Sequence, residues 1–181
     1  MFSTRELLQY GTRGSVDQAL HRMVKSGFIF RLARGVFVRD ASKTPSPKQI
    51  AQFKAAVFGR RIFTHAEKVL DGLGLESKPQ REYVRLAVNT HSSSFQTYRG
   101  RVVLQGIGVR KTKLCESDVG KALYALWYFG DNRCTDEAVA TAINRFGRTG
   151  REELRRSSAL VPAWLHHKIM FRYKGKVALA A

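Results

Sequence analysis

The sequence has few cysteines and no long apolar segment. Cys115 and Cys134 are its only cysteines, too few for a disulfide framework or for a zinc site built from cysteines. It contains no run of 18 apolar residues, so no membrane-spanning helix is expected. No apolar segment follows residues 1–5, so we expect no secretory signal. These absences indicate a cytoplasmic protein in a reducing compartment.

The sequence also lacks the motifs of common enzymes. It has no P-loop, no HExxH motif, no nucleophile elbow and no paired carboxylates in an apolar context. His65 has no serine, cysteine or acid at motif spacing, so we interpret it as a surface or capping histidine. His166 and His167 are adjacent, so they face different sides of a helix and cannot chelate one metal ion. We predict a binding protein without enzymatic activity, cofactor or metal.

Acidic residues are scarce relative to basic ones. The chain has 32 lysines and arginines but only 14 acidic residues, a formal charge of +18. This charge implies an anionic partner, with nucleic acid ranked ahead of an anionic membrane or an acidic protein. Of these we predict nucleic acid and no membrane. The charge is uneven: residues 41–114 carry +10, whereas residues 1–40 and 115–181 carry +4 each.

Residues 2–39 have the pattern of a helix, a tight turn, a second helix and a hairpin. Ser3 and Glu6 have the spacing of a capping box, and Gly11 stands where a helix end favours a left-handed residue. A second helix is predicted over residues 13–25, with Gly27 after it. Apolar segments on both sides of Gly35 predict the hairpin. The second helix has one apolar face, formed by Val16, Ala19, Leu20, Met23 and Val24.

A two-helix unit followed by a basic hairpin is typical of a winged helix-turn-helix domain. Such domains place the second helix in the major groove of DNA and the hairpin on the flanking backbone. We assign base reading to Arg13, Ser15, Gln18, His21 and Arg22, and backbone contacts to Thr12, Lys25, Arg31 and Arg34. The alternative is that these residues form ordinary solvated faces of a small helical domain.

The same segment resembles the N-terminal winged helix of AbiEi-type antitoxins, the regulators of type IV toxin–antitoxin systems. In that family a phrase TxxxLLxxGxRxxVxQALxRLVKxGxIxRLxRGxY recurs. The family usually has one more helix before this phrase, so another element is expected to cover Leu7 and the wing. Phe37 stands in place of the usual tyrosine. The matching residues are Thr4, Leu7, Leu8, Gly11, Arg13, Val16, Gln18, Ala19, Leu20, Arg22, Val24, Lys25, Gly27, Ile29, Arg31, Leu32, Arg34 and Gly35.

The resemblance implies an antitoxin whose winged helix represses its own operon, while its C-terminal domain counteracts a nucleotidyltransferase toxin. The expected partners are double-stranded operator DNA with repeats and a cognate toxin protein. Winged helices bind inverted repeats as dimers or direct repeats as single chains, so a homodimer is one of two alternatives. Two shorter phrases also resemble the family, at residues 73–75 and 160–165. Two alternatives stay open: a protein-interaction module whose basic middle segment binds an acidic partner, and a regulator or mobile-element protein without any toxin.

The rest of the chain predicts an α+β domain over residues 49–181, after a linker over residues 41–48 that holds two prolines. Helices are expected after Ser46 and His65, and in the C-terminal third. Residues 83–88 and a hairpin around Gly100 predict a small, mostly antiparallel sheet, with residues 107–109 in a further strand. Additional phosphate contacts are predicted along one sheet edge, at Arg99, Arg101, Arg110, Lys111 and Lys113.

Overall fold

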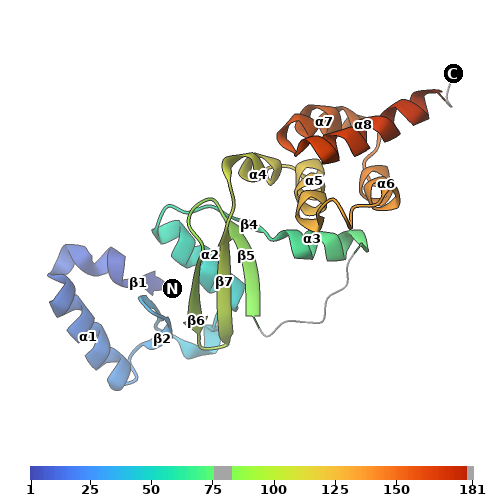
Figure 1. The fold of residues 1–181 in the computed structure, drawn as a ribbon. Coiled ribbons are helices and arrows are strands. Elements are labelled where there is room, and N and C mark those ends of the chain that lie inside the picture. Colours follow the sequence, from blue (N-terminus) through green and yellow to red (C-terminus); the bar gives the residue numbers. More distant parts are fainter. Residues whose placement is uncertain (76–82, 179–181) are drawn as a thin grey trace. The chain divides into compact units, whose positions relative to one another are not determined.

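The protein is a mixed α+β structure that divides into two compact units. The computed structural model describes residues 1–75 and 83–178. Unit 1 comprises Met1–Ile62 and Arg81–Gly106, and unit 2 comprises Phe63–Gln80 and Ile107–Ala181. Figure 1 shows the strands and helices of both. This is a division of the fold, and the functional division predicted around residues 41–48 stays a prediction.

The N-terminal elements follow the predicted order, but the first helix is of a different type. Ser3 and Glu6 form the predicted capping box, in which the Glu6 carboxylate accepts a hydrogen bond from the Ser3 amide at 2.6 Å. The helix that they begin is a 3-10 helix rather than an α-helix. The elements are β1 (Phe2–Ser3), η1 (Thr4–Tyr10), α1 (Arg13–Lys25), β2 (Phe30–Ala33) and β3 (Val36–Val38).

The turn between η1 and α1 differs from the prediction at Gly11. Its φ of 166° is extended, not left-handed. A Cβ atom at Gly11 would lie 2.9 Å from the Ser15 hydroxyl oxygen. Lack of space near the start of α1 therefore favours glycine at this position. Thr12 caps α1 by accepting a hydrogen bond from the Ser15 amide. Gly27, with φ of 74°, follows the end of α1 as predicted.

The sheet is mostly antiparallel, as predicted, but the prediction of a small sheet is wrong. The structure has one seven-stranded sheet in the order β1-β3-β2-β6-β7-β5-β4. The β6–β7 hairpin is antiparallel as expected, but β5 lies parallel to β7. The N-terminal hairpin belongs to the same sheet, since Ala33 of β2 pairs with Thr97 of β6. The further strands are β4 (Ile62–Thr64), β5 (Tyr83–Val88), β6 (Ser93–Thr97) and β7 (Gly100–Gly106).

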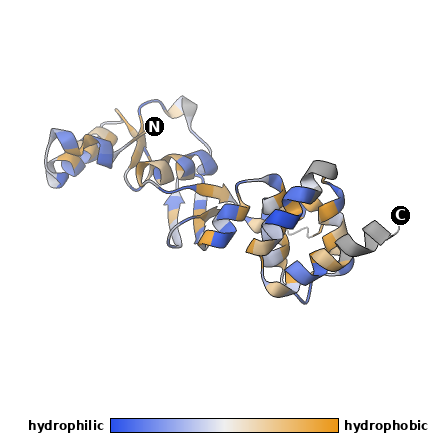
Figure 2. Ribbon diagram, turned by 90° about the horizontal axis from the view of Figure 1, so that it is seen from above, coloured by the Kyte–Doolittle hydropathy of each residue, from blue (hydrophilic) through white to orange (hydrophobic). Residues whose placement is uncertain are grey.

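Apolar residues cover both faces of the β2–β3 hairpin. On one face, Val16 and Leu20 of α1 pack with Phe37, and the ribbon of α1 carries hydrophobic and hydrophilic residues in alternation (Figure 2). On the other face, Ile50 of helix α2 (Pro47–Val57) packs with Leu32. Helix α2 therefore covers the face of the hairpin that α1 leaves open. The short helix η2 (Ala41–Lys43) connects the hairpin to α2.

Unit 2 is helical around a buried α5. In α5 the residues Leu123, Tyr124 and Leu126 are almost inaccessible to solvent. His65 caps α3 as predicted, but it is buried and not at the surface. The helices are α3 (Ala66–Leu73), α4 (Val109–Leu114), α5 (Asp118–Phe129), α6 (Asp136–Asn144), α7 (Arg148–Ser157), η3 (Ser158–Leu160) and α8 (Ala163–Ala178).

Candidate nucleic-acid interface

All nine residues that the sequence assigned to DNA contact are exposed in the structure. They lie on α1, at its N-cap and on the β2–β3 hairpin, all within unit 1. Val16 and Leu20 of the same helix are buried. Gln18, Arg22 and Lys25 lie on the side of α1 away from these two residues, whereas Arg13 and His21 lie beside Leu20. The nine exposed residues are Thr12, Arg13, Ser15, Gln18, His21, Arg22, Lys25, Arg31 and Arg34.

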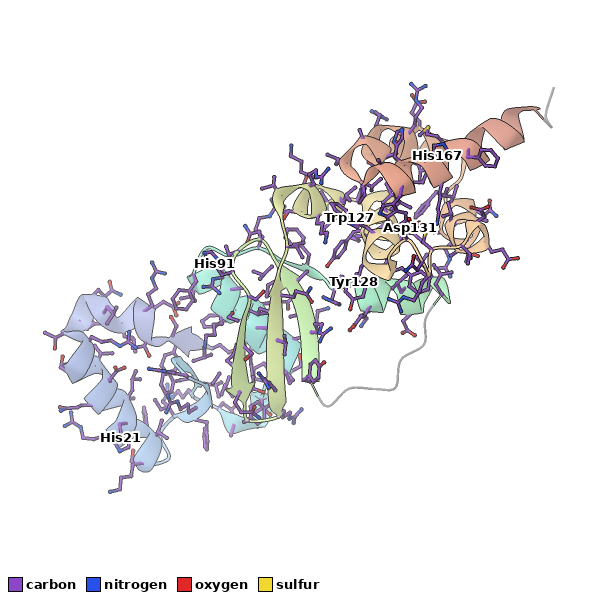
Figure 3. The ribbon with its side chains drawn as sticks, viewed as in Figure 1. His21, His91, Trp127, Tyr128, Asp131 and His167 are labelled. Carbon is purple, nitrogen blue, oxygen red and sulfur yellow. The ribbon has the colours of Figure 1, made fainter. Side chains whose placement is uncertain are left out.

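Helix α1 and the hairpin line one hollow of about 270 Å³, here called the α1–hairpin hollow. Arg13 and His21 line it from α1, and Arg31 and Arg34 line it from the hairpin. Figure 3 shows His21 on α1. Phe37 contributes apolar surface to the same hollow. The structure therefore brings together four of the nine predicted residues, which come from two separate elements.

Gln18, Arg22 and Lys25 are exposed but do not line this hollow. At spacings of four and three residues they follow one stripe of α1. Their side chains have no hydrogen-bond or ion-pair partner among the residues that the structure describes. An extended row of unpaired donors on an exposed helix can reach groups on another molecule without breaking contacts in its own chain.

Three of the predicted residues are already engaged at the start of α1. The Nε atom of Arg13 donates to a carboxylate oxygen of Asp17 at 2.9 Å, one helical turn further on. The hydroxyl of Thr12 is 3.0 Å from that of Ser15, and the Ser15 hydroxyl donates to the Thr12 carbonyl oxygen. These hydroxyls therefore stabilise the helix start, and a ligand at this position would compete with those bonds.

The tip of the hairpin is fixed by its neighbours. Gly35 has φ of 76°, a left-handed conformation that favours glycine. Its carbonyl oxygen accepts a hydrogen bond from the Thr4 amide at 3.1 Å. The Lys54 ammonium donates to the Arg34 carbonyl oxygen at 3.2 Å. The hairpin therefore presents Arg31 and Arg34 from a braced turn.

Three basic residues that the sequence did not assign lie beside the hairpin. Arg5 donates from Nη1 to the Val57 carbonyl oxygen at 3.1 Å. Its guanidinium carbon lies 5.4 Å from the centre of the Phe58 ring, and that of Arg60 lies 5.9 Å from it. Lys54, the third, lies four residues after buried Ile50, so it shares the inward stripe of α2. A lysine at an inward-facing helix position is the sequence feature from which this group of three basic residues could have been predicted.

Burial lowers the pKa of Lys54, and the nearby charges of Arg34, Arg60 and Arg31 lower it further. The ammonium also lies 4.4 Å from the centre of the Phe95 ring. Every charge that perturbs this lysine is positive, so the surroundings of Lys54 favour an added anion.

Unit 1 is the more basic unit. It contains 16 basic and four acidic residues, a formal charge of +12, whereas unit 2 contains 16 and ten, a charge of +6. Its three described acids are all engaged locally: Glu6 with Ser3, Asp17 with Arg13, and Asp40 with Ser42. None of these three carboxylates has a described contact with Lys54, Arg31 or Arg34. The excess charge of this unit is therefore poorly neutralised from within.

The predicted additional phosphate contacts do not share one edge of the sheet. Arg99 and Arg101 lie at the β6–β7 hairpin of unit 1, where Arg101 donates to the Ser94 hydroxyl at 3.0 Å. Arg110, Lys111 and Lys113 lie on helix α4 of unit 2, so their expected position at a strand end is wrong. The reason is local: residues 109–114 form a helix, and the cations of Arg110 and Lys111 lie 5.2 and 4.6 Å from the centre of the Trp127 ring.

Comparisons with known proteins add no information about this interface. No protein-family model, curated protein or solved structure matches the chain. Within residues 1–75 and 83–178, no helix is long and apolar enough to cross a membrane. The same residues contain no group of three or more histidine, cysteine or acidic side chains that could hold a metal ion.

Proposed function

We propose that the chain is a sequence-specific, DNA-binding transcriptional regulator in which α1 enters the major groove and the β2–β3 hairpin contacts the backbone beside it. The observation that carries this proposal is the α1–hairpin hollow, where Arg13 and His21 face Arg31 and Arg34. A helix and a basic hairpin that present cations to one space suit a groove edge and its flanking phosphates.

The proposal divides the roles by side-chain chemistry. Gln18 and Arg22, on the stripe beside the hollow, suit adenine and guanine edges in the major groove. Arg13 and His21, which line the hollow, are assigned to bases nearer the hairpin, and Ser15 is assigned to a base at the start of α1. Thr12, Lys25, Arg31 and Arg34 are assigned to phosphates, because backbone contacts need charge and hydroxyl donors more than they need a fixed geometry.

The pairing of β1 with β3 supports a winged-helix arrangement for this region. Phe2 and Ser3 of β1 pair with Phe37 and Val36 of β3, which closes a strand, helix, helix and hairpin unit around a small apolar cluster. The resemblance to AbiEi-type antitoxins extends the proposal: the regulator would repress its own operon and counteract a cognate toxin. A winged helix can bind inverted repeats as a homodimer or direct repeats as single chains, and the proposal includes both. The DNA-binding role stands on the residues of unit 1, and the antitoxin role stands on the resemblance alone.

A competition gel shift tests the DNA-binding role. Labelled DNA from immediately upstream of the coding sequence is bound by the full chain, and unlabelled upstream or shuffled duplex of equal length is added. The proposal expects the upstream duplex to compete at a concentration at least tenfold below that of the shuffled duplex. Equal competition by the upstream and shuffled duplexes would show that the protein binds nucleic acid without sequence preference. Absence of any shift at moderate salt would favour the alternative that the basic surface binds an acidic protein.

A further inference from the structure

Three hollows on unit 1 are linked by residues that line more than one of them. The α1–hairpin hollow shares Arg13 and Arg34 with a second hollow of about 390 Å³, which α2 also lines. The second hollow shares Lys54 and Phe58 with a third, of about 220 Å³, which extends to β6. The residues that line these hollows therefore lead from α1, around the tip of the hairpin, to α2.

Six cations line these three hollows, and they are here called the basic tract: Arg5, Arg13, Arg31, Arg34, Lys54 and Arg60. Among the residues that the structure describes, the carboxylate that lines them is that of Asp17, and it is paired with Arg13. Two serine hydroxyls, of Ser93 and Ser94, line the far end beside Arg60. Cations and hydroxyl donors along a groove are the groups that bind successive phosphates of a nucleic-acid strand.

We infer that the basic tract binds the phosphate backbone of duplex DNA beyond the bases that α1 reads, so that the footprint extends across α2 to β6. This inference rests on the proposed function and deepens it, because it names a second contact segment that the helix and hairpin alone do not supply. Lys54 and Arg60 carry the added segment. Neither belongs to α1 or the hairpin, and each lies next to further cations of the tract.

The geometry favours backbone contact over stacking of bases. Phe58 is 52% exposed and lines two of the hollows, which would suit a stacking platform for single strands. The guanidinium groups of Arg5 and Arg60 already lie against its ring, however, at 5.4 and 5.9 Å from the ring centre. A base that stacked on a covered face of this ring would have to displace a guanidinium group. Held over an aromatic ring, the two guanidiniums are instead oriented for phosphates.

The test compares the salt dependence of binding between two double variants. Lys54→Gln/Arg60→Gln removes two cations of the tract, and Arg39→Gln/Lys48→Gln removes two exposed cations of unit 1 that line none of the three hollows. Dissociation constants for upstream and shuffled duplexes are measured over roughly 50 to 200 mM salt. Each lost phosphate contact reduces the slope of log affinity against log salt by about 0.9.

We expect the tract variant to lose about two units of slope on both duplexes, with the ratio of their affinities unchanged. The control is expected to keep the wild-type slope. Hydroxyl-radical footprinting should show protection lost at one flank of the site. Because Lys54 also holds the hairpin turn, Arg60→Gln alone serves as a second variant, with an expected loss of about one unit of slope.

Three outcomes would overturn the inference. If wild type binds duplex DNA but the folded tract variant keeps the slope of the control, the extended contact is absent while the proposed function stands. If a single strand of equal length competes better than duplex for wild type but not for the tract variant, the tract binds single strands instead. If wild type binds no duplex at all, both the inference and the proposed function fail.

Discussion

The Lys54 ammonium lies 3.2 Å from the carbonyl oxygen of Arg34 and donates a hydrogen bond to it. This bond joins α2 to the tip of the β2–β3 hairpin, across 20 residues of sequence. Because the Thr4 amide donates to the neighbouring Gly35 carbonyl, two elements, η1 and α2, hold the hairpin tip. A substitution in α2 that removes the Lys54 bond should therefore also alter the position of Arg31 and Arg34, the proposed backbone contacts.

The first prediction concerns the pH dependence of DNA binding. Burial and neighbouring arginines lower the pKa of Lys54 below its usual value of 10.5. A bound phosphate would favour the charged ammonium, so binding would raise that pKa and take up a proton. Between the lowered pKa and 10.5, affinity should therefore fall as pH rises. Lys54→Arg, which keeps its charge at these pH values, should show a shallower fall in anisotropy titrations. Identical pH profiles for the two proteins would contradict the role of Lys54.

The second prediction concerns base reading by Arg22. Arg22→Ala should reduce the preference for upstream over shuffled duplex by about 1–3 kcal/mol, because a bidentate contact to a base is worth that much. Lys25→Ala, on the same stripe, should lower the affinity for both duplexes equally. It should also reduce the slope of log affinity against log salt by about 0.9. Competition titrations of the two variants measure this difference. An unchanged preference in Arg22→Ala would move that residue to the backbone contacts.

A third prediction follows from the pairing of Asp17 with Arg13. Asp17→Asn should tighten the binding of both upstream and shuffled duplexes, because it removes a negative charge and frees the Arg13 guanidinium from its 2.9 Å contact. The exposed pair costs little to lose, about 0–1 kcal/mol of folding stability. Asp118→Asn is the matched control, since Asp118 is an exposed acid paired with Lys121 in unit 2. Weaker DNA binding by Asp17→Asn would place Asp17 among the base contacts instead.

A fourth prediction tests the packing of unit 2. A Cβ at Gly120 of α5 would overlap the backbone carbonyl of Leu114 at the end of α4. Gly120→Ala should therefore lower the free energy of unfolding by about 1–3 kcal/mol, the usual cost of overpacking. Gly72→Ala is the control, since a Cβ at Gly72 in α3 meets no atom within 4 Å, and it should be neutral or stabilising by up to about 1 kcal/mol. Urea unfolding of the two variants measures this difference. Equal midpoints would show that α4 and α5 are packed less closely than the structure indicates.

The sequence predicts the features of this fold that arise within a few residues. The caps at Ser3 and Ser46 were predictable because side chain and amide lie three residues apart. The apolar stripe of α1 was readable for the same reason. The left-handed conformation predicted for Gly11 is wrong because a glycine after a helix can also be required by lack of space. Here the space is taken by the Ser15 side chain.

Features that depend on distant residues were not predictable. Strand patterns show that residues 83–88 and 100–106 are extended, but not that β5 and β7 run parallel in one large sheet with the N-terminal hairpin. In the same way, the exposed stripe of α1 was predictable, whereas the position of Arg5 and Lys54 beside Arg34 depends on how α2 packs on the hairpin. The basic tract is therefore a property of the tertiary structure.

The most direct test of the central claim is the salt dependence of affinity for the upstream and shuffled duplexes, measured by fluorescence anisotropy. The account predicts a log–log slope of about −5 for wild type, as expected if about six phosphates are neutralised, with the upstream duplex bound more tightly at every salt concentration. A slope close to zero, or equal affinities for the two duplexes, would contradict a sequence-specific DNA-binding role for α1 and the hairpin.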